Sequence, residues 1–299
     1  MPCQITQERF ELMDCSGDLG SVIAKTLPVL AVAPTARVGS AVAALKGKIY
    51  LFSGRGGVSM APIDENGAIW SYSPSESAWS LVSPANPTAS YPAARSYHTM
   101  TADGEDSIYV HAGCPEKGRL SDLWSFNTET RVWTQLPSAP DPPRGGASLT
   151  HSAGKLYRMN GFDGTQEQGG SLDVFDISGK AWSTITYHAD GVSGPEPRSV
   201  CVLVALKLSG KDFLVTMFGE HDPSSLGHAG AGKMLGDVWV FDIENRKWCR
   251  VEAQGEAPAP RGWFDADVES KGGNDHVIVH GGLAEDNSRL GDVWRLEIV

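Results

Sequence analysis

Clusters of basic residues are missing from this sequence. It has 25 Lys and Arg against 36 Asp and Glu, which gives a formal net charge of −11 at pH 7. Proteins that bind nucleic acid without sequence preference need clustered Lys and Arg to displace phosphate counterions, and binding to anionic membrane surfaces needs similar clusters. No apolar run approaches the ~18 residues of a membrane-spanning helix. We therefore exclude nucleic acids and membranes as partners, and expect a small-molecule substrate or a protein partner.

Cysteines are few, and they are scattered along the chain. The five are Cys3, Cys15, Cys114, Cys201 and Cys249. The sequence contains no Asn-x-Ser/Thr site with a permitted middle residue, and its first residues lack the basic region and apolar core of a secretory signal. These features predict reduced thiols and a cytoplasmic location.

Several catalytic motifs are also missing. The sequence has no G-x-S-x-G nucleophile motif, no phosphate-binding P-loop and no dinucleotide fingerprint. We therefore expect no cofactor, and we expect any catalysis to rest on positioning and electrostatics.

Glycine and tryptophan, in contrast, are abundant. The chain has 34 Gly and 9 Trp among its 299 residues, and this share of glycine is well above the usual value of about 7%. Few long stretches of helix-forming residues accompany them. This composition predicts many turns and many short strands.

One pattern occurs five times along the chain. An arginine opens each copy, an apolar run then ends at a glycine, and a strand with aromatic residues follows. The opening arginines are Arg37, Arg95, Arg144, Arg198 and Arg261. The apolar runs cover residues 49–54, 108–113, 156–161, 213–219 and 277–282. In the first four copies a tryptophan closes the pattern, at Trp79, Trp133, Trp182 and Trp248.

Each copy is typical of four strands separated by turns. One four-stranded sheet with two apolar faces cannot bury both alone, whereas radial stacking of several sheets buries them. The pattern resembles the Kelch repeat, whose marks are a glycine pair after the second strand and spaced aromatics in the next two; the pair stands intact at Gly281-Gly282. The resemblance implies an all-β fold, a Kelch-type β-propeller of five four-stranded blades, with six blades as the alternative. We expect a single domain over residues 1–299, with repeats that start near 37, 95, 144, 198 and 261.

The fifth copy ends at Val299, before a second aromatic. Residues 9–14 match the pattern of residues 247–252, with Phe10 in the place of Trp248. We therefore expect residues 1–36 to supply a strand that closes the ring beside residues 292–296, followed by a linker.

Functional residues of a repeat protein are expected where the copies differ. The residue after the second-strand glycine is, in order, Arg55, Cys114, Phe162, Glu220 and Leu283. These positions either line one mouth of the propeller, where their mixed chemistry suits a small asymmetric ligand, or face solvent. A second variable position holds Gly39, Tyr97, Gly146, Val200 and Trp263. There Trp263 is either a platform for a ligand or a filler at the ring axis.

The repeated arginines and two histidines each allow two interpretations. Arginines that recur are expected to be structural, because their donors can join neighbouring blades. The alternative is that Arg95, Arg144 and Arg198 point inward and polarise an oxygen-bearing group of a substrate. Similarly, His111 and His280 are either satisfied interior histidines or proton donors and acceptors in the channel.

The longest irregular insertion covers residues 219–233, between the second and third strands of the fourth copy. It contains Glu220, His221, Asp222 and His228, and long loops on a rigid scaffold often carry function. This loop, together with Arg198-Ser199-Val200 and Ala259-Pro260-Arg261-Gly262-Trp263, resembles the plant specifier proteins of glucosinolate breakdown.

That resemblance implies a ferrous iron held by a Glu-x3-Asp-x3-His pattern in this loop, which helps to steer an unstable aglucone to a nitrile or a related product. Glu220 and His228 match the first and third ligands, and Ser224 stands in the second position. Because a neutral serine is a poor ligand for a divalent cation, we expect no metal here. If Fe(II) binds, its ligands are Glu220 and His228 with Ser224 or Asp222.

Our leading interpretation is a small-molecule enzyme of specialised metabolism that acts on a reactive intermediate. It would be a lyase, an isomerase or a cyclase, for example of Diels–Alder type, with its pocket at the propeller mouth. The expected catalytic residues are Glu220, His228, Arg95 and Arg198. The expected substrate-binding residues are Trp263, Phe162, Arg144, Arg55, Cys114, His111 and Tyr97. Two alternatives stay open, a protein-interaction Kelch scaffold and an Fe(II)-dependent specifier protein.

Overall fold

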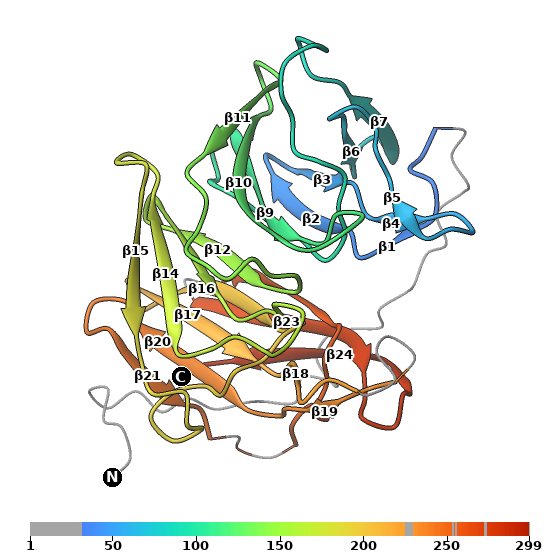
Figure 1. Cartoon of the computed structure of the whole chain (residues 1–299). Coiled ribbons are helices and arrows are strands. Elements are labelled where there is room, and N and C mark those ends of the chain that lie inside the picture. The colour runs from blue at the N-terminus through green and yellow to red at the C-terminus, as the bar shows by residue number, and fades with distance from the viewer. Residues whose placement is uncertain (1–31, 225–229, 253, 255, 272–273, 299) are drawn as a thin grey trace. The chain divides into compact units, whose positions relative to one another are not determined.

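The secondary structure of this chain consists of β-strands. A computed structural model describes residues 32–224, 230–252, 254, 256–271 and 274–298, and within them every regular element is a strand (Figure 1). In the same ranges no helix is long and apolar enough to cross a membrane. The all-β prediction is therefore confirmed.

The strands form one antiparallel sheet for each copy of the sequence repeat. The first sheet contains β2 (Ala41–Leu45), β3 (Lys48–Phe52), β6 (Ile69–Ser73) and β7 (Ala78–Val82). The second contains β8 (Thr99–Ala102), β9 (Ser107–Gly113), β10 (Leu120–Asn127) and β11 (Val132–Leu136). The third contains β12 (Ser148–Ser152), β13 (Lys155–Met159), β14 (Ser171–Asp176) and β15 (Ala181–Thr186). The fourth contains β16 (Val202–Leu208), β17 (Lys211–Met217), β20 (Val238–Asp242) and β21 (Lys247–Arg250).

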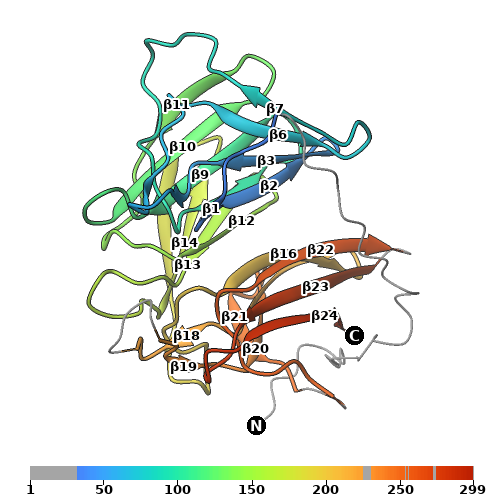
Figure 2. The ribbon, with the colours of Figure 1, turned by 90° about the vertical axis from the view of Figure 1, so that its right-hand side faces the viewer.

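The last sheet contains three strands among the described residues, which lie side by side in Figure 2. They are β22 (Asp265–Lys271), β23 (Asn274–Leu283) and β24 (Arg289–Glu297). The strand predicted to complete this sheet, with Phe10, lies outside the described residues. Each of the five sheets begins four residues after its opening arginine, at positions 41, 99, 148, 202 and 265. The predicted division into five blades is therefore confirmed.

Two small ribbons accompany the sheets. One contains β1 (Arg37–Val38), β4 (Arg55–Gly56) and β5 (Ala61–Pro62), and the other contains β18 (Glu220–His221) and β19 (Lys233–Met234). Both ribbons include the segment that joins the second strand of a sheet to the third. The ribbons therefore carry the variable positions that the sequence comparison singled out, Arg55 and Glu220.

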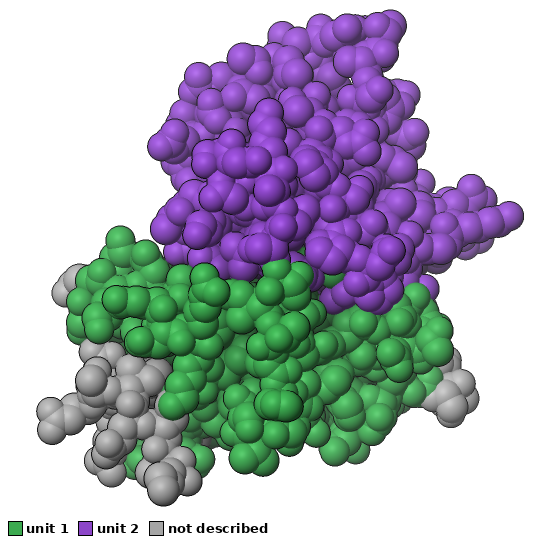
Figure 3. Space-filling model, turned by 60° about the vertical axis from the view of Figure 1, so that its left-hand side comes forward, with its two compact units in different colours: residues 1–23, 158–172, 184–299 green, residues 24–157, 173–183 purple. Residues whose placement is uncertain are grey.

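The chain divides into two compact units, shown in Figure 3. The N-terminal unit consists of residues 24–157 and 173–183, and the C-terminal unit of residues 1–23, 158–172 and 184–299. In the N-terminal unit, apolar side chains of the first and second sheets form one core. In the C-terminal unit, the fourth and last sheets share a second core. The prediction of a single domain stays a prediction.

Backbone hydrogen bonds explain why the glycine and the arginine recur. In four repeats the amide of the second-strand glycine donates to the carbonyl of the arginine that opens the next repeat. The pairs are Gly54 with Arg95 and Gly113 with Arg144, both at 2.9 Å, and Gly161 with Arg198 and Gly219 with Arg261, both at 2.8 Å. The glycine and the arginine are therefore the two halves of one contact between successive repeats.

Buried ion pairs occupy the side chains of the opening arginines. Arg95 donates to both carboxylate oxygens of Asp122, at 2.6 and 2.8 Å, and the Trp124 indole donates to the same carboxylate at 2.8 Å. The same arrangement recurs twice in the C-terminal unit. There Arg198 binds Asp237 beside Trp239, and Arg261 binds Asp292 beside Trp294. In these three repeats the contacts fix the third strand against the opening arginine.

The second-strand glycine leads to a testable expectation about stability. Gly219 has φ +104°, and a Cβ there would lie 2.7 Å from Cys201 Cβ and 2.8 Å from the Ser199 carbonyl. Gly219→Ala is therefore expected to destabilise the fold by about 3 kcal/mol or more, through both backbone strain and the clash. Gly210 is the matched control, because its φ is +80° and its Cβ would meet nothing within 4 Å. Gly210→Ala should cost only about 1–2 kcal/mol, the strain alone. Denaturant unfolding measures both, and equal losses would contradict this account.

Candidate functional site

The residue after each second-strand glycine has the same backbone geometry in four repeats. It forms an antiparallel bridge with the residue that follows the opening arginine. The bridges join Val38 with Arg55, Ser96 with Cys114, Ser199 with Glu220 and Gly262 with Leu283. The structural equivalence of these positions is thus real, although their side chains differ in charge and size.

Glu220 is the buried carboxylate of this set. It lies on β18 with 6% of its surface exposed, and its Oε1 accepts a hydrogen bond of 2.7 Å from the Gly232 amide. The ribbon of β18 and β19 places Gly232 there, because Glu220 pairs with Met234 across the ribbon. A Cβ on Gly232 would lie 2.8 Å from that oxygen. Glycine therefore allows the backbone to approach the carboxylate closely.

Glu167 is a second buried carboxylate, and the sequence analysis missed it. It is 9% exposed, it forms a backbone bridge with Phe162, and its Oε1 accepts a hydrogen bond of 3.2 Å from the Ser199 hydroxyl. Burial raises the pKa of Glu167, and the Glu220 charge adds to this, while its hydrogen bonds and His221 oppose it. Ser199 thus connects the two acids, through its hydroxyl to Glu167 and through its backbone to Glu220.

His221 follows Glu220 on β18, and its charge acts on Glu167. Its Nδ1 is 2.7 Å from the Pro197 carbonyl, and its Nε2 is 3.5 Å from Asp222 Oδ1. Because a carbonyl oxygen only accepts, Nδ1 carries a hydrogen, and Nε2 is the nitrogen left to exchange protons. The ring is about one quarter exposed. Buried acids and a partly exposed imidazole together make a group suited to proton transfer.

The N-terminal unit holds a different group at equivalent positions. Arg55 donates from Nε to the Ser96 hydroxyl at 2.7 Å and from Nη2 to the Pro115 carbonyl at 2.8 Å. Its remaining contact is with the Met60 carbonyl, so among the described residues Arg55 has no carboxylate partner. Ser96 and Ser199 occupy the same place in their repeats. The Ser96 hydroxyl accepts a hydrogen bond from Arg55, whereas the Ser199 hydroxyl donates one to Glu167.

Tyr97 and Cys114 belong to the group around Arg55. Burial raises the pKa of Tyr97, an effect that Arg55 opposes and Cys114 adds to. Burial also raises the pKa of the Cys114 thiol, against the influence of Arg119 and Arg55. A raised pKa keeps the thiol protonated near neutral pH, which argues against a nucleophilic role. Cys114 lies over Gly145, where a Cβ would meet its Sγ at 2.6 Å.

The residue at the second variable position has a left-handed backbone conformation, with positive φ, in all five repeats. The φ values are +62° at Gly39, +53° at Tyr97, +60° at Gly146, +47° at Val200 and +59° at Trp263. Hydrogen bonds link these residues from one repeat to the next. The Tyr97 amide donates to Gly39 and the Gly146 amide to Tyr97, at 2.7 and 2.8 Å, and the Trp263 amide donates to Val200 at 3.0 Å. Trp263 and Tyr97 are both half-buried, as is Phe162, and their predicted contacts with substrate remain predictions.

The other predicted basic residues differ in their contacts, and their predicted roles in catalysis and binding stay predictions. Arg95 and Arg198 are fully buried, and each guanidinium is held by a bidentate aspartate. Arg144 is buried and donates from Nε to the Pro142 carbonyl at 3.1 Å. His111 is fully buried with Nδ1 2.8 Å from the Asp122 carbonyl. His280, in contrast, is exposed. The structural interpretation of the arginines and of His111 therefore accounts for the geometry that we observe.

The described residues do not form a site that fits Fe(II). Among them no group of three His, Cys, Asp or Glu side chains is placed to hold a metal ion. Asp222 is largely exposed, Ser224 contributes only a neutral hydroxyl, and His228 lies outside the described residues. We derive no step through iron.

The prediction of reduced thiols is wrong for one cysteine. Cys249, on β21, is disulfide-bonded. Cys114 and Cys201 are free thiols, and Cys201 is buried. The scattered spacing of the cysteines had no feature that distinguished Cys249 from the others.

Comparison with known proteins decides the family. The KLHDC2/KLHL20/DRC7 Kelch-repeats domain matches residues 15–219, more than half of the chain. The chain belongs to this Kelch-repeat family. A solved structure of YjhT superposes on this Kelch protein with a TM-score of 0.66 and 15% identity, over 89% of this chain and 83% of that one. These findings confirm the predicted Kelch-type β-propeller.

Curated relatives of this Kelch protein differ in what they do. It is 25% identical to the N-(sulfonatooxy)prop-2-enimidothioate sulfolyase of Thlaspi arvense, over 87% of this chain and 77% of that protein. It is also 25% identical to acyl-CoA-binding domain-containing protein 4 of Arabidopsis thaliana and 26% identical to human host cell factor 2. The aligned parts cover 76% and 57% of this chain, but only 32% and 22% of those two longer proteins.

Proposed function

We propose that this Kelch protein is a small-molecule enzyme of the lyase type, whose proton-transfer groups are Glu167 and Glu220. The observation that carries the proposal is the state of Glu167. This carboxyl group is nine-tenths buried, and among the described residues its side-chain hydrogen bond is with the Ser199 hydroxyl. A buried acid that a neutral hydroxyl holds is costly for folding when it is ionised, and acids whose pKa is shifted by burial concentrate at functional sites.

The two carboxyl groups have different surroundings, which is what separates an acid from a base. Burial raises the pKa of Glu167 and so favours its protonated form, which can donate to a departing group. Glu220 accepts the Gly232 amide, an arrangement that suits an ionised oxygen. His221 Nε2 then returns protons between the acids and solvent.

The similarity to a sulfolyase supports the reaction class, because it spans most of both chains. Elimination of an anionic group needs a positioned acid or base more than it needs an organic cofactor. Isomerisation and cyclisation of a reactive intermediate use the same groups, and both remain within the proposal. The substrate would belong to specialised metabolism, as the sequence resemblance implies.

Glu167→Gln and Glu220→Gln test the proposal. The first substrate to assay is the N-sulfonatooxy thioimidate that a thioglucosidase releases from a glucosinolate, with products followed by mass spectrometry. Each substitution is expected to lower turnover about 100-fold or more, the usual contribution of one acid–base group. Thermal unfolding shows whether the variants stay folded. Glu76→Gln is the control, because Glu76 is exposed, and it should leave turnover unchanged. Wild-type turnover in both Glu167→Gln and Glu220→Gln would remove the acid–base assignment.

Protein binding is the second candidate function, and one surface feature favours it. The tip between β4 and β5 carries Val58, which is fully exposed, and Met60, which is 44% exposed. Exposed apolar side chains on a rigid ribbon are typical of protein-interaction sites. The host cell factors among the relatives keep this candidate open. The assay above separates the two candidates, because a scaffold has no turnover to lose.

A further inference from the structure

A serine directly after the opening arginine binds a charged side chain of the preceding repeat. In the second repeat the Ser96 hydroxyl accepts a hydrogen bond of 2.7 Å from Arg55 Nε, and Arg55 belongs to the first repeat. In the fourth repeat the Ser199 hydroxyl donates a hydrogen bond of 3.2 Å to Glu167, which belongs to the third. The first pair lies within the N-terminal unit and the second within the C-terminal unit. Serine at this position therefore holds a cation in one unit and an acid in the other.

A glycine at the same position receives a sulfur atom instead. A Cβ on Gly145 would lie 2.6 Å from Cys114 Sγ, and a Cβ on Gly262 would lie 3.0 Å from Met234 Sδ. Both sulfur atoms also come from the preceding repeat, from the segment between its second and third strands. The residue after the opening arginine therefore suits the chemical group that the preceding repeat places against it.

The backbone of Ser199 has a fixed position. Its amide donates to the Glu220 carbonyl at 3.0 Å, and the Glu220 amide donates to the Ser199 carbonyl at 2.9 Å. Ser199 is 3% exposed, so its side chain is enclosed by protein. Its hydroxyl therefore starts from an anchored backbone and ends on a carboxyl group that is itself 9% exposed.

A hydroxyl partner suits both proton states of a carboxyl group. It can donate to an ionised carboxylate, and it can accept from a protonated carboxylic acid. The contact between Ser199 Oγ and Glu167 Oε1 can therefore persist when Glu167 gains or loses a proton. A cation in the place of Ser199 would favour the ionised form alone, whereas a group that transfers protons has to pass through both forms.

We propose that Ser199 is a positioning residue, which holds the Glu167 carboxyl group in one orientation in both of its proton states. This inference rests on the proposed function of Glu167 as an acid–base group. Ser199 acts through Glu167 and contributes no proton to the substrate. Its second contact, the backbone pairing with Glu220, keeps the two acids at a fixed separation.

The charges around Glu167 set the direction of the expected effects. Burial raises the pKa of Glu167, while the Ser199 hydroxyl lowers it. The charged groups that act on Glu167 in the described part of the chain are Glu220, which raises its pKa, and His221, which lowers it. Removal of the Ser199 hydroxyl should therefore raise the pKa of Glu167 further, and removal of the Glu220 charge should lower it.

Carbon-13 NMR of the full-length protein, labelled at the glutamate carboxyl carbons, tests the contact without any substrate. Glu167→Gln identifies the Glu167 signal by its loss. We expect Ser199→Ala to move the titration midpoint of that signal to higher pH, and Ser199→Thr, which keeps the hydroxyl, to restore it. An unchanged midpoint in Ser199→Ala would overturn the proposal. If Ser199→Ala fails to fold, Ser199→Cys gives the same comparison, since a thiol of similar size is a much weaker donor.

Ser96→Ala is the matched control for a merely structural role. Ser96 is fully buried at the equivalent position of the second repeat, and its hydroxyl binds Arg55 in the N-terminal unit. Both alanine variants should lower the Tm, but Ser96→Ala should leave the titration of Glu167 unchanged. Equal shifts of the Glu167 midpoint in both variants would mean that general loosening of the fold, and not the Ser199 hydroxyl, moves it.

Turnover separates this proposal from the proposed function. Ser199→Ala should lower kcat about 10-fold, the worth of one neutral hydrogen bond, with little change in KM, and Ser199→Thr should restore kcat. An inactive Glu167→Gln beside a fully active Ser199→Ala would overturn the positioning role alone. Wild-type turnover in Glu167→Gln would instead remove the proposed function, and the positioning role with it.

Discussion

Replacing Arg198 by alanine is expected to destabilise the fold by about 3–5 kcal/mol, because it strands a buried charge. Arg198 is fully buried, and it donates to Asp237 Oδ1 at 2.6 Å and to Oδ2 at 2.9 Å. Burial alone would raise the pKa of Asp237, but the hydrogen bonds and charge of Arg198 outweigh it and hold that pKa low. Without Arg198, the Trp239 indole remains as the side-chain donor to this carboxylate in the described part of the chain. Unfolding in guanidinium chloride measures the loss.

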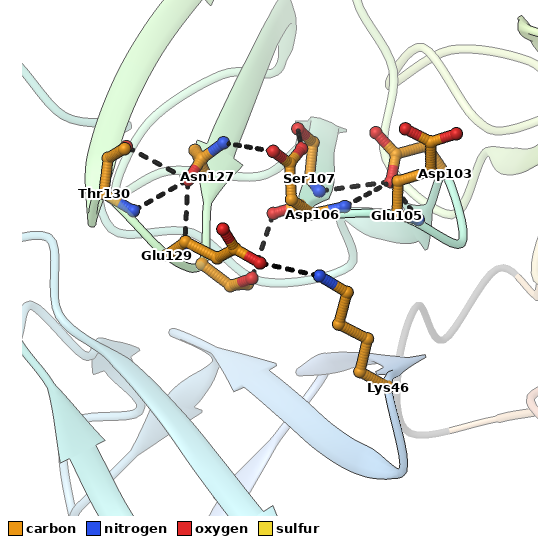
Figure 4. Close-up of polar contacts among 9 residues, drawn as sticks. Lys46, Asp103, Glu105, Asp106, Ser107, Asn127, Glu129 and Thr130 are labelled. Atoms are coloured by element: carbon orange, nitrogen blue, oxygen red, sulfur yellow. Dashed lines mark hydrogen bonds and ion pairs between the residues drawn. The ribbon is translucent and has the colours of Figure 1, made fainter.

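An exposed ion pair of the same protein provides the control for Arg198. Lys46 donates to Glu129 at 2.7 Å (Figure 4), but the two side chains are 53% and 66% exposed. Exposed pairs contribute little, because water and salt screen them. Lys46→Ala should therefore leave the unfolding midpoint unchanged. Equal effects of Arg198→Ala and Lys46→Ala would show that the buried pair is not structural.

Acidification is expected to unfold the protein through His98 before most carboxylates are protonated. Burial, together with the charge of Arg95, lowers the pKa of His98 to about 3, and a backbone hydrogen bond with Phe52 opposes the shift. Neither ring nitrogen has a hydrogen-bond partner of good geometry. The unfolded chain therefore binds a proton below about pH 6.5, whereas the folded chain stays neutral there until about pH 3.

The sign of the effect follows from proton uptake. Between about pH 6.5 and 3 the unfolded state holds more protons at His98, so stability falls as the pH falls, by up to about 1.4 kcal/mol per pH unit. Above pH 6.5 both states are neutral at this residue, and its contribution to the pH dependence vanishes. Unfolding measured from pH 7.5 to 4.5 should show this slope.

His98→Leu separates this histidine from the other titrating groups. Leucine has a similar volume and no polar atoms, so the variant should match or exceed wild-type stability at pH 7. Its stability should also depend less on pH between 6.5 and 4.5. His151→Leu is a weaker perturbation, because burial lowers the pKa of His151 with opposition from Asp103 and Glu105. A pH profile for His98→Leu that follows the wild-type profile would contradict the assignment.

Repetition explains how much of the fold the sequence predicted. Five arginines and five glycines in register located the start and the end of the inner strands, because four of these glycine amides donate to the carbonyl of the next opening arginine. Four of the five variable residues after those glycines share one backbone bridge, as Cys114 and Glu220 show, whereas Phe162 forms its bridge with Glu167. A contact that every copy repeats is visible in one sequence without an alignment.

The site was harder to predict, because its residues are the ones that do not repeat. Glu167 sits in a hairpin between the second and third strands of the third repeat, and nothing in the sequence brings it to Ser199 of the next repeat. The roles of Arg95 and Arg198 depend on Asp122 and Asp237. These acids lie 27 and 39 residues further along the chain, so their spacing is irregular. In both cases the aspartate stands two residues before a tryptophan, Trp124 or Trp239.

Residues with positive φ at the second variable position link successive repeats, and this arrangement affects how the binding specificity of Kelch proteins can change in evolution. Backbone hydrogen bonds hold glycine, tyrosine, valine and tryptophan in one conformation at equivalent positions. The conformational cost of a β-branched or bulky residue there is met by the framework rather than by its own preference. Such a position accepts almost any side chain without a change of loop structure. Evolution can therefore exchange one recognition group for another by single substitutions, and a binding specificity can be rewritten while the scaffold stays fixed.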